Sequence, residues 1–126
     1  MTPVRKRPKN LNLLTIRLPL NAMVSIMHRM SGVVLFLLLP IFLWQFQLSL
    51  TNQETYAQVM QFGRHWVIKL SLVMMAWPLC HHFYAGLRHL AQDMHWMTTL
   101  DTARLSSRLV LLLDVCSVAM IAHLVW

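Results

Sequence analysis

Three of the seven histidines lie in the stretch Cys80–Asp93, which ends a long apolar run. Each residue of a helix advances about 100°, so positions four, seven and eleven apart return to nearly the same face. One face of this stretch therefore carries His82, Gly86, His89 and Asp93. A histidine one turn before a glycine indicates a ligand beside a gap that a flat cofactor or another helix could enter. We interpret His82 as an axial ligand to the iron of a b-type haem, with the adjacent His81 as the alternative ligand.

A second polar cluster lies earlier in the chain, where Ser25, His28, Arg29 and Gly32 are spaced to share one helical face. The cluster offers a hydroxyl, an imidazole and a fixed cation. A quinone carbonyl needs a hydrogen-bond donor, which Ser25 and Arg29 could supply. A haem propionate needs a cation, which His28 and Arg29 could supply. Two simpler interpretations stay open: Arg29 could extend to the membrane surface, and each histidine could be a structural hydrogen bonder.

Both clusters border apolar segments that are long enough to cross a membrane. Of the 126 residues, 57% are hydrophobic and 12% are charged, whereas an ordinary soluble domain has about 25% charged residues. No charged residue lies in 30–53 or in 70–87, and Asp114 is the one charged residue in 109–126. A helix needs about 20 apolar residues to cross the bilayer core, so three such segments indicate three crossings.

The sequence therefore predicts an all-α bundle of three transmembrane helices. The expected spans are about 22–50, 63–94 and 103–126. A cytoplasmic arm of residues 1–20 precedes them, and residues 51–61 are expected to form a short outer loop, which could include an interfacial turn. We expect Asn21 to cap the first span, and Asp101 or Thr102 to cap the third.

The positions of the basic residues indicate how the chain crosses the membrane. Of the eleven lysines and arginines, six precede Met30, three lie in 88–108 and none follows Arg108. This positive-inside asymmetry places the N-terminus and the second connection in the cytoplasm and the C-terminus in the periplasm. Topology and contact with anionic lipid then explain the net charge of +7 without a nucleic-acid partner.

In this topology both polar clusters lie near the cytoplasmic surface. His82 lies about 10 Å deeper than His89, from the rise of the helix. A haem bound at His82 could point its propionates toward His28, Arg29 and His89. Asp114 lies within the third span, where an acid is a functional candidate, but we prefer a structural role with its hydrogen bonds satisfied.

Two motifs resemble a known family. Residues 25–32, S-I-M-H-R-M-S-G, resemble the S-I-x-H-R-x-S-G motif of the cytochrome b556 subunits of succinate dehydrogenase, membrane anchors of respiratory complex II. Residues 82–93 resemble the H-x-x-x-G-x-R-H-x-x-x-D motif of the same family. Residues 7–17 are similar to the N-terminal arm of proteobacterial members, although the R-P-x-S-P-H-L of many members is R-P-K-N-L-N-L here. The family has no counterpart of Asp114 known to us.

The resemblance implies a four-subunit enzyme of the bacterial inner membrane. A flavoprotein oxidises succinate, an iron–sulfur subunit relays the electrons, and two small membrane anchors bind haem b and reduce ubiquinone. This chain would be one anchor and would carry no catalytic residue of its own. By motif position His82 would bind the haem iron, Ser25 and Arg29 would belong to the quinone site, and His28 and Arg29 would lie near the propionates. The second axial histidine would come from the other anchor.

The chain also needs a partner subunit on physical grounds. Three helices cannot readily enclose a haem, and one axial histidine needs a second axial ligand from elsewhere. A related alternative is the anchor of a quinol:fumarate reductase, which runs the same chemistry in reverse. An alternative of another class is a haem-free membrane protein, such as a small transporter or channel component, in which Arg29 and Asp114 line a path.

Overall fold

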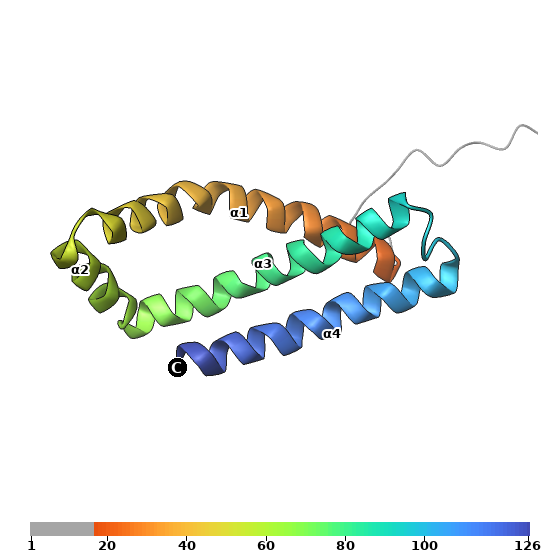
Figure 1. The fold of residues 1–126 in the computed structure, drawn as a ribbon. Coiled ribbons are helices and arrows are strands. Elements are labelled where there is room, and N and C mark those ends of the chain that lie inside the picture. The colour runs from red at the N-terminus through yellow and green to blue at the C-terminus, as the bar shows by residue number, and fades with distance from the viewer. Residues whose placement is uncertain (1–16) are drawn as a thin grey trace, which may run out of the picture.

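The computed structural model describes residues 17–126, which form four helices and no strand. The helices are α1 (Leu20–Thr51), α2 (Gln53–Gly63), α3 (Trp66–Asp93) and α4 (Leu100–Val125). Three are long, and α2 is a short connection at one end of the bundle (Figure 1). The predicted all-α class is confirmed. Most of the predicted arm lies outside the described residues.

The first helix begins without the cap that the sequence suggested. The N-cap of α1 is Pro19, with φ −65°, and no side chain caps the helix. Asn21 already lies inside α1, so its expected role as the cap is wrong. Its side-chain oxygen instead accepts a hydrogen bond from Ser107 of α4 at 2.9 Å. The Pro19 carbonyl oxygen accepts hydrogen bonds from the N–H groups of Ala22 and Met23 at 3.0 and 3.2 Å, so α1 begins on backbone hydrogen bonds without a side-chain cap.

The segment expected as an outer loop is largely helical, so the prediction of a loop over 51–61 is wrong. Asn52 and Thr55 form a capping box at the start of α2. The Asn52 side chain accepts from the Thr55 N–H at 2.9 Å, and the Thr55 hydroxyl accepts from the Asn52 N–H at 3.3 Å. Glu54 in the first turn adds a negative charge at the positive end of the helix dipole. These local signals outweigh the polar composition that suggested a loop.

The last helix also begins earlier than expected. Thr99 is the N-cap of α4, and its hydroxyl accepts from the Thr102 N–H at 3.4 Å. The expected caps Asp101 and Thr102 are therefore wrong, because both lie in the first turn. Asp101 there favours the helix dipole.

The three long helices pack with α3 between α1 and α4 (Figure 1). Their common core is small and consists of Val24, Ala85 and Val110, with Tyr84 and Leu111 against it. Large apolar side chains instead cover the outside, for example Phe36 at 74% and Leu124 at 75% exposed. A soluble monomer rarely exposes so much apolar surface, so this chain must be covered by lipid, by partner subunits or by both.

Length and composition identify two candidate membrane spans among the described residues, α1 and α4. The third long helix, α3, has 28 residues, which is about 42 Å of helix. It is not among these two candidate spans, and it carries Lys69 near its start and His81, His82 and Arg88 toward its end. The two histidines and Arg88 need polar partners, and they find them on α1 and α4.

Candidate functional site

Histidine and glycine alternate across the contact between α1 and α3. His28 and Gly32 are one turn apart on α1, and His82 and Gly86 are one turn apart on α3. Each glycine lies against the histidine of the other helix. A Cβ at Gly32 would be 2.9 Å from Cε1 of His82, and a Cβ at Gly86 would be 3.3 Å from Nε2 of His28. The two glycines therefore provide the space for the two imidazoles, as helix interfaces in membranes commonly do with small residues.

The His82 ring is oriented by hydrogen bonds to α1. Its Nδ1 lies 3.2 Å from the carbonyl oxygen of His28 and 3.3 Å from the hydroxyl of Ser31. The Ser31 hydroxyl itself donates to the same His28 carbonyl at 2.8 Å. A carbonyl oxygen can only accept, so Nδ1 of His82 carries the proton. The lone pair is therefore on Nε2, which has no hydrogen-bond partner among residues 17–126. This is the arrangement of a histidine prepared to bind a metal through Nε2.

His28 and His89 complete a cluster of three imidazoles with His82. The rings of His28 and His82 are stacked, with centroids 4.2 Å apart and planes 12° apart. His89 meets His28 edge to face at 5.1 Å. Nε2 of His28 is buried and has no hydrogen-bond partner within residues 17–126. A buried imidazole nitrogen without a partner is costly, so this cluster could bind an acceptor or donor that lies beyond residues 17–126.

The other two predicted site residues lie on the same helix as His28. Ser25 is half-buried and Arg29 is exposed, and neither side chain is hydrogen-bonded to another described residue. The structure thus brings His28, His82 and His89 together and leaves Ser25 and Arg29 available beside them. No group of three or more His, Cys, Asp or Glu in the described part of the chain is placed to hold a bare metal ion. A single histidine, however, is sufficient for one side of a haem iron.

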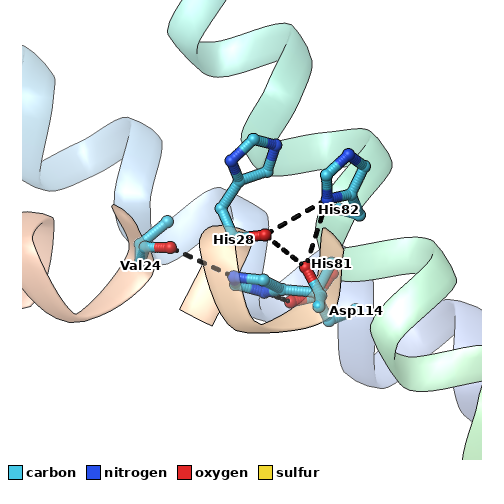
Figure 2. A network of polar contacts seen from close by, with 6 residues as sticks. Val24, His28, His81, His82 and Asp114 are labelled. Atoms are coloured by element: carbon cyan, nitrogen blue, oxygen red, sulfur yellow. Dashed lines mark hydrogen bonds and ion pairs between the residues drawn. The ribbon is translucent and has the colours of Figure 1, made fainter. Parts of the chain in front are cut away.

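His81 is arranged in the opposite way, with both ring nitrogens occupied. Its side chain is completely buried, with Nδ1 2.6 Å from Oδ2 of Asp114 and Nε2 3.2 Å from the carbonyl oxygen of Val24. Figure 2 shows this ring between the two acceptors, beside the stacked His28 and His82. Because neither nitrogen of His81 is free, the geometry favours His82 over His81 as a metal ligand.

Sequence reasoning missed that His81 and Asp114 form a pair. Asp114 is 2% exposed, which agrees with the structural role preferred for it, although Oδ1 has no partner among residues 17–126. The signal was present: an ionisable residue within each of two neighbouring apolar helices is expected to find the other. Three further hydrogen bonds join α3 to α4: Tyr84 bonds Ser117 at 2.8 Å, and Arg88 donates to the Ser106 hydroxyl at 3.0 Å and to the Ala103 carbonyl oxygen at 3.4 Å.

Comparison with known proteins adds a second kind of observation. Residues 3–121 match the family model described as succinate dehydrogenase/fumarate reductase transmembrane subunit. The chain is 32% identical over 123 residues to a protein of Coxiella burnetii named succinate dehydrogenase cytochrome b556 subunit, covering 96% of this chain and 98% of that protein. Proteins with the same name in Rickettsia typhi and Paracoccus denitrificans are 30% and 32% identical. These alignments cover 96% and 81% of this chain, and 91% and 78% of the relatives.

Proposed function

This chain belongs to the succinate dehydrogenase cytochrome b556 subunits, within the succinate dehydrogenase/fumarate reductase transmembrane subunit family, and we propose that it binds haem b and ubiquinone. The family expected from the two motifs is confirmed. Membership of this family removes the support for a haem-free transporter. The names of these relatives favour succinate oxidation over fumarate reduction as the physiological direction.

The observation that carries the proposal is the state of the His82 ring. Its Nδ1–H donates to the His28 carbonyl, which leaves Nε2 as the free ligand atom. His82 would hold the haem iron, and a histidine of the other membrane anchor would be the second ligand. When bound, haem b supplies a one-electron carrier in the membrane. Ser31 and Gly32 keep the ring of His82 close to α1, so the ligand atom has a defined direction before any cofactor binds.

The propionate side of the haem would be formed by His28, Arg29 and His89. His28 lies within ring contact of both His82 and His89, and its unpartnered Nε2 could donate to a carboxylate. Arg29 follows His28 directly and presents an exposed guanidinium. Arginine pairs with carboxylates through two parallel hydrogen bonds, so these residues suit the anionic edge of a haem.

The quinone site would use Ser25 and Arg29. The two residues are one helical turn apart on α1, and their hydroxyl and guanidinium can each donate to a quinone carbonyl oxygen. These donors would stabilise the negative charge that develops on the oxygen during reduction. Because no described side chain competes for them, both can respond to a bound quinone.

We also propose the membrane arrangement that the basic residues predict. Helices α1, α3 and α4 would cross the bilayer, with the N-terminus cytoplasmic, the C-terminus periplasmic and α2 at the outer surface. In a bacterial inner membrane this places the histidine cluster near the cytoplasmic face. The flavoprotein and iron–sulfur subunit would bind on that side, and the second small anchor would cover part of the exposed apolar surface.

The test is to purify the complex in mild detergent and record its reduced-minus-oxidised spectrum. The proposal predicts a b-type spectrum that is lost in His82→Ala while the subunits still purify together. His123→Ala, which removes an exposed histidine of α4, is the matched control and should keep the spectrum. A His82→Ala complex with an unchanged spectrum would refute the proposed ligand.

A further inference from the structure

The proposed function leaves the buried pair of His81 and Asp114 unused. His81 is 0% exposed and Asp114 is 2% exposed. Removing two ionisable groups from solvent has a large desolvation cost, which apolar residues of the same volume would avoid. Such a pair therefore suggests a requirement other than stability. The neighbours of the pair indicate what that requirement is.

His81 and His82 form two neighbouring hydrogen bonds from α3 to α1, and we call this pair of bonds the fork. His81 donates through Nε2 to the carbonyl oxygen of Val24, and His82 donates through Nδ1 to the carbonyl oxygen of His28. The two carbonyls are one helical turn apart on α1. Figure 2 shows both contacts on the same side of α1. Because the two histidines are adjacent in the sequence, a slide of α1 along α3 would disturb both bonds together.

Asp114 gives this fork its third point of attachment, on α4. Its Oδ2 lies 2.6 Å from Nδ1 of His81, so the ring cannot turn without losing the contact. The bond to Val24 also fixes the residue directly before Ser25. The buried pair on α3 and α4 thus fixes the position of two groups on α1. They are the His28 carbonyl, which orients His82, and Ser25, which is proposed to bind the quinone.

We propose that His81 and Asp114 are positioning residues that set the register of α1 against α3, and so aim the His82 ring and place Ser25. The inference rests on the proposed role of His82 as haem ligand. A partner that orients a metal-binding histidine commonly changes metal affinity or activity by about tenfold or more when it is removed. Here the effect passes through His81 and the backbone of α1.

The decisive variant is the double substitution His81→Phe and Asp114→Leu. Phenylalanine keeps a flat ring, leucine keeps an apolar side chain of similar size, and apolar replacements of a complete buried pair are often tolerated. The matched control is Tyr84→Phe, which removes a different α3–α4 hydrogen bond one turn away and touches no carbonyl of α1. Asp114→Asn serves as the conservative rescue, since its amide can donate to Nδ1 while Nε2–H still donates to Val24.

Two readouts are measured on the purified complex: the electron paramagnetic resonance spectrum of the ferric haem, and the KM and kcat for a soluble ubiquinone analogue. The double variant should assemble with normal flavin content and show shifted g-values. Its KM for the ubiquinone analogue should rise by roughly fivefold, as expected for the loss of one hydrogen bond between Ser25 and the quinone. Asp114→Asn and Tyr84→Phe should resemble the unmodified complex in both readouts.

A double variant that matches Tyr84→Phe in g-values and KM would overturn the proposal. If the double variant does not assemble, Asp114→Leu alone is measured in the same way. Failure of both to assemble, with Asp114→Asn intact, would assign the pair to folding of the bundle and would also overturn it. His82→Ala separates this inference from the proposed function: if that variant keeps the haem unchanged, the ligand assignment itself is wrong.

Discussion

The three glycines provide a graded test of how closely His82 packs on α1. A Cβ added to Gly63 would have no neighbour within 4 Å. A Cβ added to Gly86 would lie 3.3 Å from Nε2 of His28, and one added to Gly32 would lie 2.9 Å from Cε1 of His82. Ordinary contact begins at 3.4 Å, so Gly32→Ala must displace the His82 ring by about 0.5 Å. Gly86→Ala needs about 0.1 Å from His28 by the same comparison.

The expected energies follow the same order. Overpacking a tight contact costs typically about 1–3 kcal/mol. Alanine in place of glycine in a helix interior recovers up to about 1 kcal/mol, a gain shared by Gly32 and Gly86, which lie inside α1 and α3. The displaced ring of His82 is also the one whose Nδ1 must stay within reach of the His28 carbonyl, at 3.2 Å. Gly32→Ala should therefore weaken haem binding, whereas Gly63→Ala should leave it unchanged.

The assay is haem per flavin in the purified complex, followed by the temperature at which the haem spectrum is lost. We expect Gly32→Ala to lose haem first, Gly86→Ala to lie between, and Gly63→Ala to match the unmodified complex. Equal haem content and equal thermal loss in Gly32→Ala and Gly63→Ala would refute the reasoning, because it would mean that the His82 ring does not depend on this contact.

Two further predictions concern the quinone donors and the short helix. Arg29→Leu should lower succinate:ubiquinone activity by about tenfold or more, which is the effect of losing a charged hydrogen bond. Dye-linked succinate oxidation should persist in this variant. Equal loss of both activities, or a similar loss in the exposed Arg104→Leu control, would indicate a role in assembly instead. Asn52→Ala should remove the cap of α2 and destabilise the protein by about 1 kcal/mol with the haem spectrum intact, and a haem loss in this variant would show that α2 influences the distant histidine cluster.

The sequence was sufficient to place His28 with Gly32 on one helical face and His82 with Gly86 on another, because that placement has a local cause. A spacing of four between His28 and Gly32, and again between His82 and Gly86, places each pair on one helical face whatever the surroundings. It could not show that each glycine accommodates the histidine of the other helix. That arrangement depends on the register of two antiparallel helices, which is set by contacts between residues more than fifty positions apart.

The helix ends and the buried pair were harder to predict for different physical reasons. The capping box of Asn52 and Thr55 is a local signal, but the polar residues around it also suit a loop. The pairing of His81 with Asp114 needs α3 and α4 to be placed side by side first. The sequence offered His81 as an alternative ligand and Asp114 as a structural acid, and only the packed bundle shows that the two side chains are partners.

The most direct test of the central claim is chemical rescue at the proposed ligand position. His82→Gly would leave a cavity in place of the imidazole, and free imidazole added to the purified complex could occupy it. We expect His82→Gly to lose the low-spin b-type spectrum and added imidazole to restore it. The same substitution at the neighbouring His81 should keep a low-spin haem without added imidazole. A low-spin spectrum that persists in His82→Gly without imidazole would contradict the assignment of the iron to His82.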